Sequence, residues 1–171
     1  MTNQERELVR AFEDYFSEND VDAVMFRDLQ HMGSDQKIDI FLDSAEHGFY
    51  GIEHKAKKIK SGKLYFSSHF SEKEIDGEGK VHQIETISRF LEKSGREGYL
   101  ALQVRRGRGK STDTYFIDWS FVVEKYNDSE CSGIDMTLLD DMVDGSEPVF
   151  KVPRVKGEWV VSEEVIEKLV S

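Results

Sequence analysis

The 171-residue sequence predicts an α/β fold in which helices flank a mixed central β-sheet. Apolar residues recur with helical spacing over residues 3–17 and again over 80–94, and strand-like segments lie between and after these two stretches. The continuous apolar run over residues 99–104 is typical of a strand at the centre of a sheet. The resulting order, α-β-β-β-α-β-β, favours an α/β sandwich.

The two long helices are each predicted from an apolar stripe. In residues 3–17 the stripe comprises Leu8, Val9, Phe12, Tyr15 and Phe16, and in residues 80–94 it comprises Val81, Ile84, Ile87 and Leu91. Gly95 ends the second helix. Charged side chains occupy the other side of the first helix, so one face of it is expected to be buried.

Strands are expected at residues 22–27, 38–43, 47–55, 99–104 and 115–119, with a possible short strand at 64–66. The last two long strands pair across the glycine-rich segment 105–112. In the second strand, Ile38, Ile40 and Leu42 share one face and Asp39 lies on the other. In the third strand, Gly51, Glu53 and Lys55 share one face, whereas Tyr50, Ile52 and His54 share the opposite one.

The rest of the chain is less regular. Residues 57–79 are polar and predicted to be irregular, residues 126–147 form an acidic insertion, and 149–152 with 158–161 suggest a hairpin before a closing helix that begins at Ser162. We expect one domain, divided into a core (1–125), the acidic insertion (126–147) and a C-terminal ββα extension (148–171).

Composition narrows the class of protein. The chain has 34 acidic and 23 basic residues, a net charge of −11, and enough aromatic residues to argue against disorder. No window approaches 18 consecutive apolar residues and the first ten residues include Glu5, Arg6, Glu7 and Arg10, so we expect no membrane span, no signal peptide and a cytoplasmic location. A single cysteine, Cys131, excludes an intramolecular disulfide and a cysteine-zinc site.

Basic residues gather in two short clusters despite the acidic total. The first comprises Lys55, Lys57, Lys58, Lys60 and Lys63, and the second comprises Arg105, Arg106, Arg108 and Lys110. The clusters are either solvated loops or sites of contact with nucleic-acid phosphates.

Two carboxylates and a lysine are predicted to meet at one end of the sheet. If the second and third strands form an antiparallel pair, Asp39 and Glu53 converge, and Lys55 points in the same direction as Glu53. Carboxylate oxygens suit a hard divalent cation that keeps waters for a phosphate substrate. Because Glu-x-Lys is short and recurs at Glu78-Gly79-Lys80, a surface ion pair is the alternative.

A third carboxylate, Glu5, extends the apolar stripe of the first helix. It either joins the site or closes a capping box with Thr2. The five histidines show no metal-binding pair at helical spacing, and Ser34 lacks a Gly-x-Ser-x-Gly frame, so zinc and serine-hydrolase chemistry are not favoured.

These residues resemble the PD-(D/E)xK nuclease superfamily, and more narrowly the archaeal-type Holliday junction resolvases. The resemblance rests on Glu5-Arg6-Glu7-Leu8-Val9, Gly33-Ser34, Lys37-Ile38-Asp39 and Ile52-Glu53-His54-Lys55, and continues through Ile87-Ser88-Arg89-Phe90, Tyr99-Leu100-Ala101-Leu102 and the aromatic strand ending at Trp119. The start of the chain lacks the family's basic residues, and the segments after Lys55 and after Tyr126 are longer.

The resemblance implies a restriction-endonuclease-like fold and a homodimer that resolves four-way DNA junctions by paired symmetric nicks, in an archaeon or its virus. It implies that Asp39, Glu53, the main-chain carbonyl of His54 and Glu5 bind Mg²⁺, for which Mn²⁺ can substitute. Lys55 would activate the attacking water, Ser34 would contact the scissile backbone, and Gln83 would lie near the site. The alternatives are another nuclease of the superfamily, acting on ends, flaps or a specific sequence, and a non-catalytic DNA-binding protein.

Overall fold

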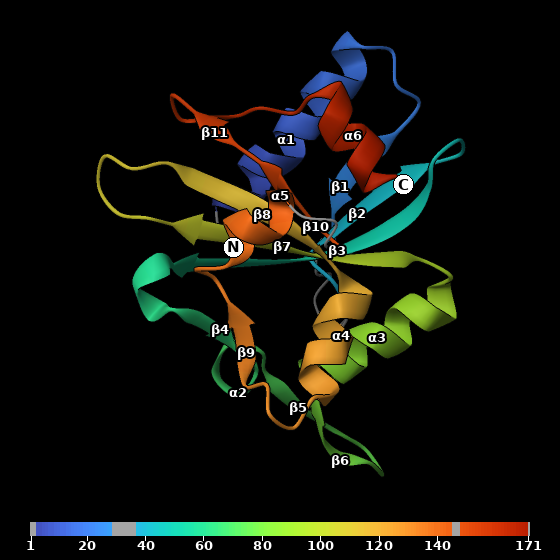
Figure 1. Ribbon diagram of the computed structural model, residues 1–171. Coiled ribbons are helices and arrows are strands. Elements are labelled where there is room, and N and C mark those ends of the chain that lie inside the picture. Colours follow the sequence, from blue (N-terminus) through green and yellow to red (C-terminus); the bar gives the residue numbers. More distant parts are fainter. Residues whose placement is uncertain (1–2, 29–36, 145–147, 171) are drawn as a thin grey trace.

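The computed structural model describes residues 3–28, 37–144 and 148–170. Its centre is a six-stranded mixed sheet with helices on both faces (Figure 1). The predicted α/β fold with a mixed central sheet flanked by helices is therefore confirmed. Among the described residues, no helix is both long enough and apolar enough to cross a membrane.

The sheet has the strand order β1-β2-β3-β7-β8-β10. These strands are β1 (Val24–Arg27), β2 (Ile40–Ser44), β3 (Gly48–Lys58), β7 (Glu97–Arg105), β8 (Thr112–Asp118) and β10 (Val149–Val152). The β3–β7 pair is parallel, and the other four pairs are antiparallel. A parallel pair needs a crossover connection, which here includes helix α3 (Gln83–Ser94).

Each face of the sheet buries its own apolar cluster. Helices α1 (Asn3–Glu18) and α6 (Glu163–Leu169) cover the face that carries Tyr50 and Ile52, whereas α3 and α4 (Trp119–Asn127) cover the face that carries Leu100 and Leu102 (Figure 1). Below, these are called the α1 face and the α3 face. Gly98 is a point of close approach on the α3 face, since a Cβ there would lie 2.7 Å from the Trp119 Cβ.

Smaller elements pack on the side of α3 and α4. They are η1 (Ile59–Ser61), β4 (Lys63–Tyr65), α2 (Phe66–His69), β5 (Glu72–Ile75), β6 (Gly79–His82), β9 (Gly133–Asp135) and α5 (Leu139–Asp144). Strand β4 pairs with β9, and β5 pairs with β6. Near the C-terminus, β11 (Arg154–Val155) pairs with β12 (Glu158–Trp159).

Several predicted elements are confirmed. The first helix, the antiparallel β2–β3 pair and the pairing of β7 with β8 form as expected. The division of β3 is also confirmed, because Tyr50 and Ile52 lie on the α1 face while Gly51 faces Ile38 and Leu91 on the α3 face.

Other expectations are wrong in ways that packing explains. Ile38 does not share a face with Ile40 and Leu42, because it precedes β2 and packs on the α3 face. The second helix begins at Gln83 rather than at residue 80, since the His82 side chain accepts the Ile84 N–H and caps the helix there. Residues 57–79 are more regular than predicted, since they hold η1, β4, α2 and β5, and the possible short strand at 64–66 forms as β4.

The end of the chain also departs from the prediction. Trp119 does not end a strand but begins α4, because the Asp118 carboxylate accepts the Ser120 N–H as an N-cap. The expected hairpin between 149–152 and 158–161 does not form: β10 joins β8 in the main sheet, and β12 pairs with β11. The acidic segment 126–147 contributes apolar side chains of β9 and α5 to the core.

Candidate active site

Asp39 and Glu53 face each other across the start of the β2–β3 pair. The last paired residues are Ile40 and Ile52, so Asp39 stands one step further along the same register, opposite Glu53. The Asp39 side chain accepts the backbone N–H of His54 at 2.8 Å, and its main-chain carbonyl accepts the N–H of Asp28 at 3.0 Å. Both contacts fix Asp39 beside the strand that carries Glu53.

Glu53 is almost fully buried, with 2% of its surface exposed. Its Oε1 accepts hydrogen bonds from Lys55 Nζ at 2.7 Å and from Gln83 Nε2 at 2.8 Å. Burial, followed by the negative charge of Asp39, raises the pKa of Glu53 to about 7 although Lys55 acts in the opposite direction. Burial likewise raises the pKa of Asp39, and hydrogen bonding joins the two carboxyl groups.

The segment after β3 folds back over the lysine. Lys55 Nζ lies 5.0 Å from the centre of the Phe70 ring and 3.4 Å from Gln83 Oε1. The same Gln83 oxygen accepts the Ser71 N–H at 3.2 Å. Gln83, at the start of α3, therefore ties Glu53, Lys55 and the returning segment together.

Glu5 reaches the same end of the sheet from the α1 face. Its carboxylate binds Arg27 at 3.1 Å and lies 3.8 Å from His54 Nδ1. Desolvation by burial lowers the pKa of His54 to about 4, so the ring is neutral at pH 7. Thr2, the other half of the alternative capping box, lies outside the described residues.

The chemistry of this donor set fits a hard divalent cation. Two carboxyl groups are in contact here, the buried Glu53 and the half-buried Asp39, and desolvation raises the pKa of both. A bound cation would favour their charged forms. Mg²⁺ is commonly held by one or two carboxylates while it keeps several waters. Within the described ranges, no group of three or more His, Cys, Asp and Glu side chains is arranged as a ready metal cage.

The two basic clusters come together in the fold, because β3 and β7 are parallel neighbours. Lys58 at the end of β3 is in register with Arg105 at the end of β7, and both are exposed. Lys60, in η1, and Arg108 and Lys110, in the β7–β8 turn, are exposed as well, whereas Lys57 and Lys63 are half-buried. Lys58 and Arg105 therefore lie beyond Lys55 along the β3–β7 pair.

Arg106 differs from its neighbours because it binds within the protein. Its guanidinium contacts Asp140 at 2.8 Å, Asp113 at 3.8 Å and the Tyr115 hydroxyl. Asp140 also accepts Tyr115 Oη at 2.6 Å and Lys151 Nζ at 3.1 Å. Within the described residues, Arg106 therefore differs from Arg105, Arg108 and Lys110, because its guanidinium is held by side chains of the protein itself.

Ser34 lies outside the described residues, so its predicted contact with the scissile backbone stays a prediction. Sequence reasoning missed Phe70 and Ser71, which reach the site only because residues 57–82 fold back. It also missed Gln103 on β7 and Thr114 on β8. These two residues are partners in register and are fully buried. Gln103 sits inside an apolar strand pattern, a polar exception that could have been noticed.

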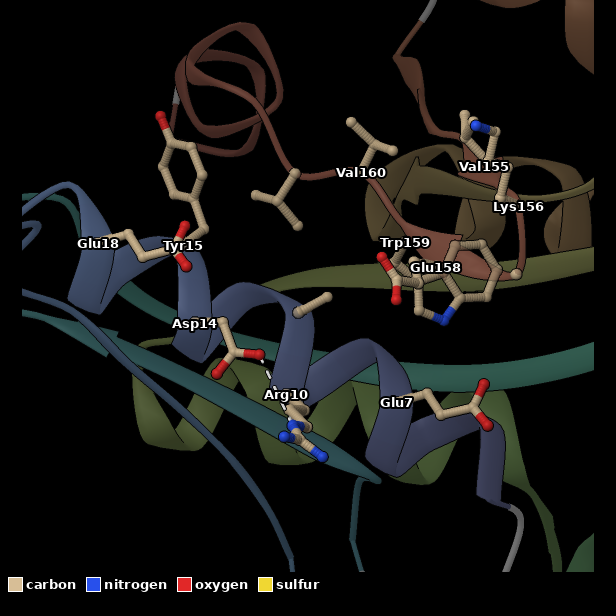
Figure 2. Close-up of a pocket in the computed structure, with 13 residues that line it drawn as sticks. Glu7, Arg10, Asp14, Tyr15, Glu18, Val155, Lys156, Glu158, Trp159 and Val160 are labelled. Atoms are coloured by element: carbon tan, nitrogen blue, oxygen red, sulfur yellow. Dashed lines mark ion pairs between the residues drawn. The ribbon is translucent and has the colours of Figure 1, made fainter.

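The carboxylate site lies apart from a groove elsewhere on the surface. A groove of about 760 Å³ runs between α1 and the β11–β12 segment, lined by residues such as Tyr15 and Trp159 (Figure 2). Its rim carries both signs of charge, including the Arg10–Asp14 ion pair. None of the predicted site residues lines this groove.

Comparisons with known proteins find similarity among solved structures. No family model and no curated protein matches the chain. Among solved structures, the chain is similar to Hjc, a Holliday junction resolvase from the archaeal hyperthermophile Archaeoglobus fulgidus, with a TM-score of 0.41 and 18% sequence identity. The match covers 75% of this chain and 88% of that one.

Proposed function

We propose that this protein is a metal-dependent nuclease that hydrolyses DNA phosphodiester bonds. The observation that carries the proposal is the Asp39–Glu53 carboxylate pair, in which Glu53 is buried and accepts hydrogen bonds from both Lys55 and Gln83. An exposed Glu-x-Lys ion pair would need none of this burial. The second Glu-x-Lys tripeptide, Glu78-Gly79-Lys80, is exposed on the β5–β6 hairpin, where Glu78 pairs with Arg89.

Asp39 and Glu53 would hold Mg²⁺, or Mn²⁺ in its place, and we assign the main-chain carbonyl of His54 and the carboxylate of Glu5 as further ligands, direct or through water. The bound ion would lower the pKa of a water molecule and neutralise charge on the phosphate. Gln83 orients Glu53, and Asp39 is oriented by the His54 N–H. Lys55 would orient the attacking water and stabilise negative charge on the phosphate.

The proposed substrate is a four-way DNA junction, cut by paired symmetric nicks. The exposed lysine and arginine side chains at the ends of β3 and β7, where Lys58 and Arg105 are partners in register, would contact DNA phosphates. The resemblance of the motif and of the first helix to junction resolvases supports this substrate. Duplex ends, flaps or a specific sequence are the competing substrates.

A cleavage assay tests the proposal. End-labelled four-way junction, matching linear duplex and single strand would each be incubated with Mg²⁺ or with EDTA at fixed salt. We expect paired symmetric nicks in the junction with Mg²⁺ and no cutting in EDTA. Cutting of duplex or single strand instead would keep the nuclease activity and replace the proposed substrate, whereas junction binding without cleavage would leave a DNA-binding protein.

Variants connect the activity to the site. Lys55→Ala and Glu53→Gln should lose cleavage and retain the fold, since each removes a group that acts on the reacting atoms. Lys80→Ala is the matched control, because Lys80 ends the second, exposed Glu-x-Lys and should not affect cleavage. Undiminished cleavage by either site variant would falsify the assignment.

A further inference from the structure

The segment that folds back over Lys55 presents a tyrosine and a histidine beside the candidate active site. Strand β4 ends at Tyr65 and α2 begins directly after it, so Tyr65 and His69 are one helical turn apart. Their ring centres are 6.1 Å apart. Tyr65 is 41% exposed and His69 is half-buried, so both rings are accessible from solvent. We call these two residues the Tyr65–His69 pair.

Hydrogen bonds at both ends of α2 hold this segment in place. The Phe66 N–H donates to the Ser132 carbonyl at 3.1 Å. After α2, the Gln83 N–H donates to the Ser71 carbonyl at 2.8 Å, and the Ser71 N–H donates to Gln83 Oε1 at 3.2 Å. The segment is therefore attached to the same residue that orients Glu53.

A hydrogen bond decides which nitrogen of His69 is available to a ligand. Nδ1 accepts the Tyr65 N–H at 2.8 Å, so the neutral ring carries its proton on Nε2. Desolvation by burial, followed by the positive charges of Lys57 and Lys55, lowers the pKa of His69 and favours the neutral ring. Within the described residues, Nε2 donates to no protein group, and it is not fully buried. His69 thus offers one N–H donor that the fold does not use.

This donor lies beside two lysines of β3. Lys55 and Lys57 point to the same side of the strand and are about 7 Å apart along it. Lys55 Nζ lies 5.0 Å from the ring centre of Phe70, the residue after His69. Lys57 forms no ion pair in the part of the chain that the structure describes. The charged groups that act on His69 are these two lysines, without a described carboxylate among them.

The phosphate of a nucleic acid suits this surface. Phosphate oxygens accept hydrogen bonds and carry the negative charge that lysines attract. The basic side chains continue past Lys57 to the Lys58–Arg105 register pair, a length that a polymer of phosphates would follow and a single small anion would not. An exposed tyrosine ring also packs well against the sugar or base of a nucleotide.

We propose that the Tyr65–His69 pair binds the nucleotide next to the scissile phosphate of the DNA, with His69 Nε2 donating to its phosphate and the Tyr65 ring packed against its sugar. The inference rests on the proposed function, because Lys55 would contact the scissile phosphate and Lys57 lies one step beyond it along β3. The contact comes from the segment between β3 and α3, outside the nuclease motif itself.

Two substitutions of His69 separate this role from a purely local one. His69→Asn keeps an acceptor near the position of Nδ1 for the Tyr65 N–H but removes the Nε2 donor. His69→Gln loses that acceptor and places an amide N–H near the position of Nε2. Fluorescence anisotropy with a labelled four-way junction in EDTA should show roughly tenfold weaker binding by His69→Asn and about threefold or less by His69→Gln. A histidine that only closes the turn would give the opposite order.

The same assay includes a control and a test of the tyrosine. His47→Asn is the matched control, because His47 is also half-buried but precedes β3, at the end of the strand away from Lys57, and should bind as the wild type does. Tyr65→Ala should weaken binding several-fold, whereas Tyr65→Phe keeps the ring and should not. Circular dichroism on each variant checks that the fold is retained.

Ethylation interference on the end-labelled junction identifies the contacted phosphate. Ethylation removes the charge of a phosphate, so the wild type should bind less well when the phosphate beside the nick is ethylated. His69→Asn should lose this interference and keep the interference at other positions. The position of the wild-type interference relative to the nick needs no variant, so it tests the proposal even if a substitution disturbs folding.

The proposal is overturned if His69→Asn binds as tightly as the wild type, if His69→Gln is the weaker of the two, if His47→Asn loses as much affinity, or if no phosphate beside the nick interferes. Cleavage with undiminished binding by His69→Asn would remove this contact and keep the nuclease. Interference that disappears in His69→Asn, with no cleavage by the wild type, would keep the phosphate contact and remove the proposed function.

Discussion

The side-chain amide of Gln83 donates to Glu53 Oε1 at 2.8 Å, the same oxygen that Lys55 Nζ contacts at 2.7 Å. The orientation of the amide is fixed, because its oxygen accepts the Ser71 N–H at 3.2 Å. Gln83 thus couples the geometry of a buried carboxylate to the segment that folds over the site.

Gln83→Ala should lower the cleavage rate about 10- to 100-fold, the range typical when a group that orients a metal ligand is lost. The fold should persist, because Gln83 is at the first turn of α3 and not in the apolar core. Single-turnover cleavage with increasing Mg²⁺ measures the effect, which extra metal should partly restore. Glu92→Ala, exposed on the same helix, is the control; an equal loss in both variants would contradict the positioning role.

Glu53→Gln should change how the stability of the metal-free protein depends on pH. The pKa of Glu53 is about 7 in the folded protein and near 4.5 in the unfolded chain, so between these values the folded state holds the extra proton. The contribution of Glu53 to the free energy of unfolding therefore falls as pH rises from about 4.5 to about 7. The fall is about 1.4 kcal/mol for each unit of difference between the two pKa values.

The variant lacks this titration, so its free energy of unfolding should exceed that of the wild type above pH 7 and fall below or match it near pH 5. Urea unfolding in EDTA across this range measures the difference. His54, whose lowered pKa acts in the opposite direction, is common to both proteins and cancels. A constant difference at every pH would show that Glu53 is ionised normally.

Arg105→Ala and Arg106→Ala should differ despite their adjacency. Arg105 is exposed, and its loss should weaken junction binding and reduce the slope of log affinity against log salt by about one. Arg106 is bound to Asp140 and Asp113, so its loss should cost about 1–3 kcal/mol of stability. Binding titrations at several salt concentrations and urea unfolding distinguish them; identical effects would count against this division.

Gly133→Ala should destabilise the β4–β9 pair. A Cβ at residue 133 would lie 2.3 Å from the Leu64 carbonyl oxygen and 2.8 Å from the Tyr65 Cα, and these backbone atoms cannot simply rotate away. We expect a loss of about 1–3 kcal/mol, typical of overpacking. Thermal unfolding measures it, with Ser132→Ala, an exposed neighbour, as the control. An unchanged melting temperature would contradict the close approach.

The central sheet could be predicted because its strands follow simple local patterns. The alternation along β3 placed Glu53 and Lys55 together, and the antiparallel β2–β3 pair brought Asp39 opposite Glu53 as expected. These relationships depend only on the period of two in a strand and on one pairing.

What could not be predicted depends on contacts distant in sequence. Phe70 and Ser71 reach Lys55 and Gln83 only after residues 57–82 have folded against the body. β10 pairs with β8 rather than with a neighbour in sequence, because its residues Val149 and Phe150 can be buried there. Helix α4 was missed because it begins at Trp119, directly after the aromatic strand β8 ends at Asp118, with no glycine or proline between them to mark the boundary.

Binding of a divalent cation by Asp39 and Glu53 is the central claim, and titration calorimetry with Mn²⁺ on the DNA-free protein tests it most directly. We expect binding by the wild type, release of protons at pH 7 as Glu53 ionises, and at least tenfold weaker binding by Glu53→Gln. Lys80→Ala should bind as the wild type does. Absence of binding, or equal binding by Glu53→Gln, would contradict the account.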